Sequence, residues 1–448
     1  MDMQRLSTGM MERYEIDDRR PARINAVQFG MGEALLGTAD RLIDDMNAAL
    51  APDARVGFAC VQAGEAGYAD RLNAQDGMYT LLVRGYEGEQ AVHREQVVQC
   101  VLRAFGGDGV GALARDPAIA WGLVDDAPEA RSLAARFRAL RAAAGLPGIP
   151  LIWLGDRADG AEAPDGTAVA DSLAFRAEPD EAARQCAEMN YLDEMLHVAE
   201  PYARLTLCGA PDALRERFPA GAAGIRFEEP GEAAASARLK AQVFDAGIFL
   251  MAAPGWLNGC DTLSDCMRSE RLRRFVGEGF TQELLPALAD MDRQAVEQRV
   301  IESFERYENP LNRNRILRAA HHLAARFVAG PCRSIRQLAE ARFEPPRRLS
   351  FALAATIMLY AGARRNPDTG AFEVARGKQS EALHEDEAVL ARFAALSHDM
   401  DPESLAYAAL ADRELWGRDL REVDGLWERV ALDIAAMQRQ PDFLPDGD

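Results

Sequence analysis

Lysine is almost missing from this chain. Of the 51 lysine and arginine residues among 448, only Lys240 and Lys378 are lysines. Arginine stays protonated in proteins, whereas a lysine amine can be tuned to exchange its proton. Lys240 stands near the start of the apolar run RLKAQVFDAGIFL (238–250), which has the pattern of a helix. A lysine kept there, in so arginine-rich a chain, is a candidate for proton transfer.

The chain also lacks an excess of positive charge, since its net charge is −20. This argues against nucleic acids and anionic membranes as partners, since phosphates need a basic face. A small anionic substrate needs only a local group of arginines. The N-terminus lacks the apolar core of a signal peptide, and no apolar run reaches the length of a membrane span.

Cysteine and histidine occur without the spacing of a disulfide framework or a metal site. The seven cysteines are scattered and contain no C-x-x-C pair, which favours reduced thiols in a cytoplasmic protein. The six histidines form no ligand set, so we expect no metal.

The first half of the chain has the pattern of a parallel α/β domain. The apolar run 24–29 ends in a Gly-Met-Gly turn, a helical pattern follows to residue 50, and a second apolar run covers 55–61. This order of strand, glycine turn, helix and strand opens a doubly wound, Rossmann-like fold. Further strand candidates are 78–84, 119–124, 149–154, 204–208 and 224–228, while 155–169 is predicted to be a loop.

The patterns become mainly helical past residue 233. We therefore predict a Rossmann-like domain over 1–233 and a mostly α-helical domain over 234–448. Five segments then follow one another in a familiar order, namely 28–47, 72–85, 259–267, 305–310 and 347–362. Together they resemble the long-chain polyol and sugar-acid dehydrogenases of the mannitol dehydrogenase family, and most of all the tagaturonate (altronate) and fructuronate reductases. The resemblance implies a nicotinamide-binding first domain, a helical second domain and a substrate cleft between them.

The family's catalytic signature is Lys-x4-Asn-x2-His, in which the lysine is the acid/base and the other two hold the substrate oxygen. Lys240 matches the lysine, but Asp245 replaces the asparagine and Ile248 the histidine. An ionised aspartate repels a developing alkoxide, and isoleucine donates nothing. Losing such donors typically costs about 10²–10³ in rate each. An ion pair with Asp245 is the structural alternative for Lys240.

On the cofactor side the resemblance implies contacts from the glycine turn and from the segment 125–130. The expected cofactor-binding residues are Phe29, Gly30, Met31, Gly32 and Glu129. Glu33 stands in the first helical turn, where its charge is expected to compete with a pyrophosphate. Glu65 is the candidate reader of the 2′-hydroxyl, with no basic cluster beside it, which leans toward NAD over NADP.

On the substrate side the resemblance implies roles for Arg176, Asn309 and Arg326, together with Asp245. Asn314 stands where the family commonly has histidine. In a chain so rich in arginine, a surface ion pair is the alternative for each arginine.

Two hypotheses follow. The first is a cytoplasmic, NAD(P)-dependent oxidoreductase, monomeric or homodimeric, that interconverts a keto and a hydroxy sugar acid or polyol with Lys240 as acid/base. The second is a catalytically inactive relative that serves as a binding or regulatory scaffold. The kept lysine favours the first, and Glu33, Asp245 and Ile248 favour the second.

Overall fold

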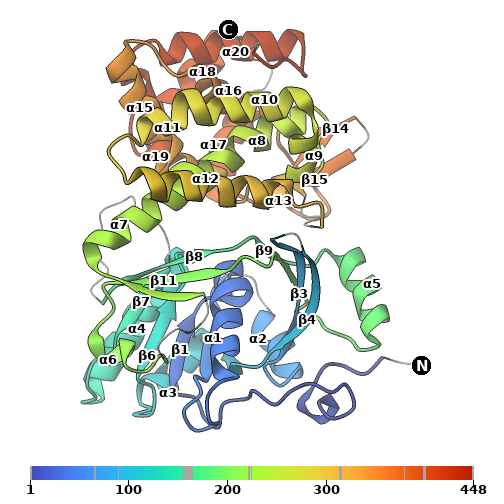
Figure 1. The fold of residues 1–448 in the computed structure, drawn as a ribbon, viewed down its shortest axis with the longest axis vertical. Helices are drawn as coiled ribbons and strands as arrows, with labels where there is room; N and C mark the ends of the chain where they lie inside the picture. Colours follow the sequence, from blue (N-terminus) through green and yellow to red (C-terminus); the bar gives the residue numbers. More distant parts are fainter. Residues whose placement is uncertain are drawn as a thin grey trace. The chain divides into compact units, whose positions relative to one another are not determined.

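The chain forms two compact units, Met1–Ser236 and Ala237–Asp448. The structure, a computed structural model, describes residues 3–64, 67–88, 90–154, 165–219, 222, 224–311, 315–377, 379–396 and 400–445 (Figure 1). Glu65 and Asn314 lie outside the described residues, as does most of the predicted loop, 155–164.

An eight-stranded sheet forms the centre of the first unit. Its strand order is β12-β11-β8-β7-β6-β1-β2-β5, and β1 pairs in parallel with both β2 and β6. Only the β8–β11 pair within it is antiparallel among the described residues. The strands are β1 (Ala26–Phe29), β2 (Phe58–Val61), β5 (Val101–Phe105), β6 (Trp121–Val124), β7 (Leu151–Leu154), β8 (Thr167–Asp171), β11 (Arg204–Cys208) and β12 (Ile225–Glu228). The prediction of a parallel, Rossmann-like α/β fold is confirmed.

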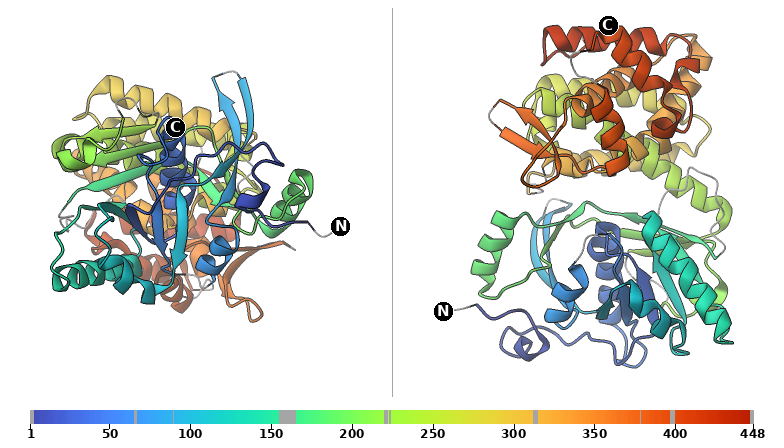
Figure 2. Two further views of the ribbon diagram at one scale, coloured as in Figure 1. Left: turned by 90° about the horizontal axis from the view of Figure 1, so that it is seen from below. Right: turned by 180° about the vertical axis from the view of Figure 1, so that it is seen from behind.

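Helices cover both faces of this sheet, which explains why its strands are continuously apolar. On one face lie α3 (Val110–Ala114) and α4 (Pro128–Ala143), and the Phe29 and Phe137 rings meet there at 5.4 Å between centroids. On the other face the π-helix η2 (Ala34–Ala39) continues into α1 (Asp40–Asn47). Figures 1 and 2 show α1 and α4 from opposite sides.

A second sheet packs against the other side of α1 and corrects two predictions. Its order is β4-β3-β10-β9, with the strands β3 (Tyr79–Glu87), β4 (Gln90–Val98), β9 (Ala174–Arg176) and β10 (His197–Ala199). The predicted strand 78–84 therefore belongs to this sheet and not to the central one. The predicted loop 155–169 was wrong at its end, because β8 begins at Thr167 and pairs with β11. The unit also contains η1 (Thr8–Met10), η3 (Gly107–Gly109), α2 (Tyr68–Ala74), α5 (Pro179–Met189) and α6 (Asp212–Arg215).

The second unit is mainly helical and is built around two apolar helices, α8 (Ala246–Leu257) and α16 (Arg347–Ala361), which are buried along almost their whole length. Around them lie α9 (Leu263–Arg268), α10 (Glu270–Gly279), η5 (Phe280–Leu284), α11 (Leu285–Ala287), α12 (Arg293–Glu308), α13 (Ile316–Ala319), α14 (Leu323–Ala329), α15 (Pro331–Arg342), α17 (Glu387–Ala395), α18 (Pro402–Ala411), α19 (Arg413–Trp416), η6 (Leu420–Glu422) and α20 (Leu426–Arg439). Within the described ranges, no helix combines the length and apolar character that a membrane span requires.

The structure also contains a small sheet that the sequence patterns did not predict. It has the order β13-β14-β15 and consists of β13 (Arg364–Arg365), β14 (Phe372–Arg376) and β15 (Gln379–Ala382). α7 (Pro230–Leu239) spans the boundary between the two units. All seven cysteines are free and buried, in agreement with the expectation of reduced thiols.

Candidate functional site

Lys240 lies on a π-helical segment that brings it next to Asp245. The segment η4 runs from Lys240 to Asp245, directly between α7 and α8. In a π-helix the backbone hydrogen bonds run from i to i+5, so residues five apart come to lie above one another. In an ordinary α-helix Lys240 and Asp245 would face different directions. The insertion therefore creates the pair, and such π-segments occur frequently at functional sites.

A buried carboxylate and two cations form the centre of this site. Lys240 Nζ donates to Asp245 Oδ2 at 2.6 Å, and Arg326 lies 3.6 Å from Asp245 Oδ1. The Asp245 side chain is only 4% exposed, whereas that of Lys240 is 21% exposed. The carboxylate is thus held inside the unit while the ammonium group reaches its surface. This pair is compatible with both alternatives for Lys240, namely a role as acid/base and a purely structural ion pair with Asp245.

His321 extends the cluster behind Arg326. A guanidinium nitrogen of Arg326 lies 3.0 Å from His321 Nε2, and His321 Nδ1 lies 3.2 Å from the Arg318 carbonyl oxygen. Burial, and then the charge of Arg326, lower the pKa of His321 well below its usual value. The ring is therefore neutral near pH 7: Nδ1–H donates to the carbonyl, and Nε2 accepts from the guanidinium. His321 fixes the position of Arg326.

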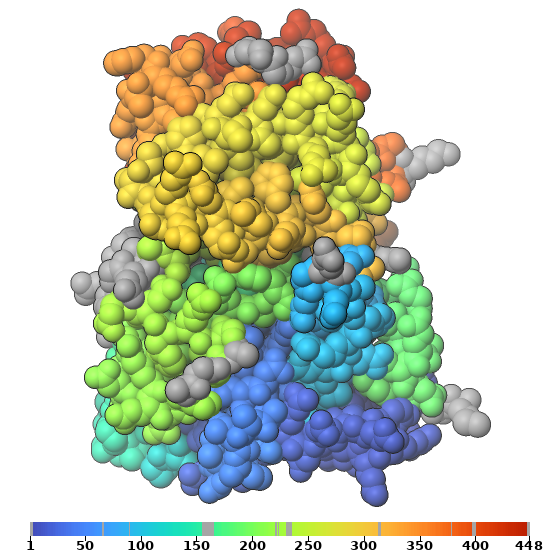
Figure 3. All heavy atoms as spheres, viewed as in Figure 1, coloured from blue at the N-terminus to red at the C-terminus, as the bar shows by residue number. Residues whose placement is uncertain are grey.

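Tight packing holds the π-segment in place. The Tyr307 hydroxyl of α12 donates to the Phe244 carbonyl oxygen at 2.6 Å, next to the place where the π-turn departs from α-helical hydrogen bonding. Gly330, before α15, lies so close to the Ala241 carbonyl that a Cβ atom would overlap it. One face of α12 is exposed on this unit, as the gold atoms near residue 300 in Figure 3 show. Its opposite face, which carries Tyr307, is buried.

The remaining residues on the substrate side are placed as follows. Ile248 is fully buried in α8, so it supplies no polar group where the family signature has histidine. Asn309 is also buried, and its Oδ1 accepts from the backbone N–H of Leu311 at 3.1 Å. Arg176 lies in the first unit, where its guanidinium donates to the Tyr68 hydroxyl at 2.9 Å.

The glycine turn of the first unit is filled by the side chain of Asp125. This residue directly follows β6, the neighbour of β1. Gly32 N–H donates to Asp125 Oδ2 at 3.1 Å, and Asp126 N–H donates to Asp125 Oδ1 at 2.8 Å. Gly30 has φ = +103°, and a Cβ atom built on it would lie 2.5 Å from Asp125 Cβ. The space that these glycines leave open is therefore already occupied.

Two acidic side chains lie near this turn. Glu129, in the first turn of α4, accepts from Gly64 N–H at 2.7 Å, just after β2. Glu33 accepts from the backbone N–H of Arg176 at 3.2 Å and makes no side-chain cap of the helix that follows. The competition between the Glu33 charge and a pyrophosphate therefore stays a prediction, while the Asp125 carboxylate takes the Gly32 N–H.

The side chains of the other residues expected to bind the cofactor belong to the core. Phe29 is fully buried, and Met31 is nearly so. Only their backbone atoms are left to meet a ligand, and the Phe29 carbonyl already accepts from Asp125 N–H at 2.8 Å.

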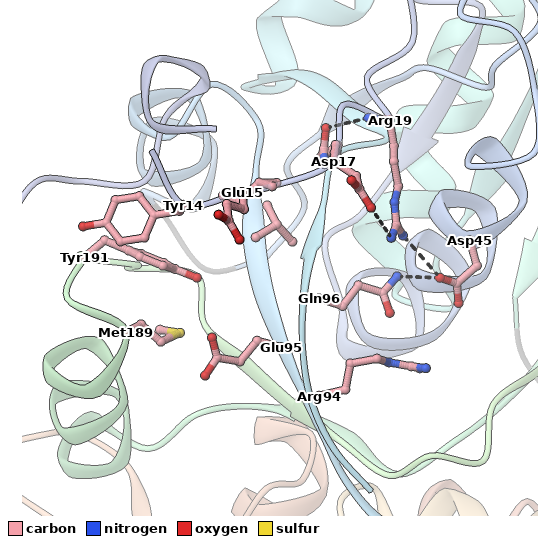
Figure 4. A pocket seen from close by; sticks show the side chains of 13 residues that line it. Tyr14, Glu15, Asp17, Arg19, Asp45, Arg94, Glu95, Gln96, Met189 and Tyr191 are labelled. Atoms are coloured by element: carbon pink, nitrogen blue, oxygen red, sulfur yellow. Dashed lines mark hydrogen bonds and ion pairs between the residues drawn. The ribbon is translucent and has the colours of Figure 1, made fainter. Parts of the chain in front are cut away.

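A polar pocket of about 300 Å³ opens elsewhere in the first unit (Figure 4). Its wall contains Tyr14, Glu95 and Tyr191, together with Arg19, whose guanidinium lies 3.5 Å from Asp44. The lining residues differ from all of the predicted site residues.

One group of possible metal ligands lies together in the described part of the chain. His322 Nδ1 is 3.5 Å from a carboxylate oxygen of Glu385 and 3.5 Å from one of Asp386. Glu385 also accepts from Ala324 N–H and from the Tyr360 hydroxyl, at 2.9 and 3.0 Å. The first of these bonds ties Glu385 to a free backbone N–H in the first turn of α14, so the group has a structural explanation. The absence of a metal stays a prediction.

Comparison with known proteins finds a similarity that covers most of the second unit. A family profile described as "Mannitol dehydrogenase C-terminal domain" matches residues 238–438. The predicted resemblance to the mannitol dehydrogenase family is thereby confirmed. Altronate oxidoreductase of Bacillus subtilis is 23% identical over 96% of this chain and 95% of its own length. Altronate oxidoreductase of Yersinia pestis is 24% identical, with 91% and 93% covered.

Solved structures of mannitol dehydrogenase and a related enzyme share the fold. The mannitol 2-dehydrogenase of Pseudomonas fluorescens, solved with NAD and D-mannitol, has a TM-score of 0.77 and 14% identity over 98% of each chain. A D-sorbitol dehydrogenase in substrate-free form has a TM-score of 0.64 and 14% identity over 98% of this chain and 99% of its own. These similarities establish the two-part fold.

This fold leads us to test the glycine turn for a dinucleotide. A pyrophosphate in such a turn takes backbone N–H donors at the start of the helix. Here a carboxylate takes the Gly32 donor and fills the space beside Gly30. With Asp125 in this position, the residues present do not fit a pyrophosphate.

The sequence patterns missed His321 and Gly330, and they placed Asp125 only within the segment 125–130 that was expected near the cofactor. Asp125 belongs to the Asp-Asp pair that directly follows the predicted strand 119–124. Side chains that follow adjacent parallel strands meet at one edge of the sheet, so this position could have indicated a contact with the glycine turn. His321 and Gly330 act only through tertiary contacts, with Arg326 and with the Ala241 carbonyl.

Proposed function

We propose that this chain is an oxidoreductase that interconverts the keto and hydroxy forms of a sugar acid or polyol, with Lys240 as its acid/base. The similarity to altronate oxidoreductases over more than nine-tenths of the chain supports the reaction class. The single observation that carries the role of Lys240 is its position on the π-segment, with Nζ 2.6 Å from a buried carboxylate.

In the proposed proton step, the Lys240 ammonium group donates to the substrate oxygen as the ketone becomes an alcohol, and the amine takes this proton back in the reverse direction. Such a step typically contributes about 10²–10⁴ in rate. Asp245 orients the ammonium group through its 2.6 Å hydrogen bond. It takes the place of the family's asparagine, so it positions Lys240 and does not donate to the substrate.

Arg326 is the proposed partner for a substrate carboxylate. It and Lys240 both lie beside the Asp245 carboxylate, and these three described side chains together carry more positive than negative charge. His321, which is neutral, does not change this balance. An acidic sugar therefore suits the cluster better than a neutral polyol. Asn309 and Arg176 stay predicted substrate contacts.

NAD is the proposed electron carrier, because it is the cofactor bound in the related mannitol 2-dehydrogenase structure. Because Asp125 fills the glycine turn, that turn does not fit a pyrophosphate. The residues of this chain therefore support the proton transfer by Lys240, and no hydride step is derived from them.

The variant Lys240→Arg tests the proposal, because arginine keeps the positive charge and the ion pair but does not exchange a proton. We expect it to fold normally and to lose about 10²-fold or more of the NAD-dependent oxidation of altronate. Lys378→Arg, the same change at the only other lysine, is the matched control and should keep full activity. An active Lys240→Arg variant would contradict the role of Lys240.

A second candidate is a non-catalytic binding scaffold. The specific observations that favour it are Asp125 in the glycine turn and the loss of two donors at Asp245 and Ile248. If the wild-type chain shows no turnover with any sugar acid, even when NADH is shown to bind, this candidate replaces the first.

A further inference from the structure

We infer that Asp125 is a built-in competitor for the dinucleotide turn and sets the affinity of this chain for its cofactor. Its carboxylate stands where a pyrophosphate oxygen would stand and uses the same backbone donor. The inference rests on the proposed function only in assigning the turn to a dinucleotide, and it does not depend on turnover.

The geometry shows that Asp125 is held in the turn. Both of its carboxylate oxygens accept backbone hydrogen bonds, from Gly32 at 3.1 Å and from Asp126 at 2.8 Å. Its own N–H donates to the Phe29 carbonyl at the end of β1, at 2.8 Å. The backbone of Asp125 is thus fixed at β1, and its side chain can leave the turn only if the two bonds to its oxygens break.

The space in the turn leads to the same conclusion. Glycine at positions 30 and 32 normally allows a phosphate to approach the backbone closely. Here the Asp125 side chain takes that room, because a Cβ atom on Gly30 would lie 2.5 Å from Asp125 Cβ, and one on Gly32 would overlap Asp125 Oδ2. A pyrophosphate and this side chain cannot occupy the turn together.

Charge adds to the competition. Asp126 and Glu129 follow Asp125 within four residues, and the three carboxylates lie at the same end of the parallel strands where the pyrophosphate would arrive. Asp126 is paired with Arg131, and Glu129 accepts from Gly64 N–H. Asp125 is the one of these three that contacts the glycine turn itself, so its removal should have the largest effect.

A titration of NADH, followed by its fluorescence and by calorimetry, tests the inference with the full chain and three variants. Asp125→Ala removes both the charge and the occupancy, whereas Asp125→Asn removes the charge and keeps the shape. Asp126→Asn is the matched control, because it removes one charge at the next position without touching Gly32. We expect Asp125→Ala to bind NADH about tenfold or more tightly than wild type. In wild type, NADH binding must first break the hydrogen bond from Gly32 N–H to the charged Asp125 carboxylate, and in the variant this bond does not exist. Asp125→Asn should lie between wild type and Asp125→Ala, and Asp126→Asn should change the affinity for NADH least of the three variants.

Two results would overturn the inference. One is equal affinity of wild type and Asp125→Ala for NADH, and the other is no binding by either Asp125 variant although circular dichroism shows both to be folded. Failure of the proposed function has a different signature, namely tight NADH binding by Asp125→Ala without oxidation of altronate.

Discussion

Asp40 carries the prediction whose magnitude follows most directly from the structure. This carboxyl group is completely buried between the two sheets of the first unit, and burial raises its pKa to about 8. The Tyr79 hydroxyl lies 2.7 Å from the Leu36 carbonyl and 3.2 Å from Asp40 Oδ2. The Tyr79 hydroxyl donates to both acceptors, and its bond to Asp40 offsets only part of the effect of burial on the pKa of Asp40. Asp40 is therefore neutral in the folded chain at pH 7.

The sign of the pH dependence follows from this neutral state. In the unfolded chain Asp40 has an ordinary pKa of about 3.9. Below that value both states hold the proton, so Asp40 gives its full contribution to stability. Between about 4 and 8 the unfolded chain releases a proton that the folded chain keeps, and folding weakens by up to about 1.4 kcal/mol per pH unit. The penalty at pH 7 has an upper limit of about 4 kcal/mol.

The variant Asp40→Asn removes this penalty, because an amide of nearly the same size stays neutral at every pH. We expect it to lie within about 1 kcal/mol of wild type near pH 4.5 and to be more stable by about 2–4 kcal/mol at pH 8. Hydrogen exchange read by mass spectrometry over residues 34–47 reports the first unit separately from the second, at both pH values. Asp53→Asn, an exposed carboxylate, is the control and should change little. A variant that is equally stabilised at both pH values, or destabilised at pH 8, would refute the reasoning.

Two further predictions concern the second unit. Pairing with Glu385 raises the pKa of His322 and lowers that of Glu385, so the pair stabilises fully between the ordinary values of about 4.3 and 6.5; the contribution fades as the pH rises through the raised pKa of His322. His322→Asn should therefore lower the free energy of unfolding in denaturant by about 0.5 kcal/mol at pH 6 and by less at pH 8.5. Asparagine is chosen because it tolerates the left-handed backbone at φ = +51°. An equal loss at both pH values would contradict the pairing. Gly330→Ala places a Cβ atom against the Ala241 carbonyl and should destabilise the unit by about 1–3 kcal/mol and reduce activity by displacing Lys240. The control Gly277→Ala, with open space around it in α10, should be neutral or stabilising, and a harmless Gly330→Ala would show that the π-segment tolerates movement.

Much of the fold could be predicted from the sequence, because buried parallel strands are continuous apolar runs that glycine turns and helical patterns separate. The segments 24–29 and 119–124 illustrate this, since β1 and β6 lie inside them. The segment 78–84 has the same apolar character, and only tertiary pairing places β3 in a second sheet. The β13–β15 sheet was missed because its strands are short and mostly polar.

The candidate site could be predicted only in part. Lys240 was identifiable because lysine is so rare here, and its motif partner Asp245 followed from the spacing of the family signature. The π-segment that joins them leaves no pattern in the sequence, because α- and π-turns use the same residue types. Asp125 reaches Gly32 across 93 positions, and no local rule connects the two.

The oxidation of altronate by NAD tests the central claim most directly when wild type, Asp125→Ala and the double variant Asp125→Ala with Lys240→Arg are measured side by side. The account predicts that Asp125→Ala is more active than wild type at limiting NAD, and that adding Lys240→Arg removes nearly all of this activity while NADH binding stays unchanged. A double variant as active as Asp125→Ala would contradict the account, because Lys240 would then have no part in the reaction.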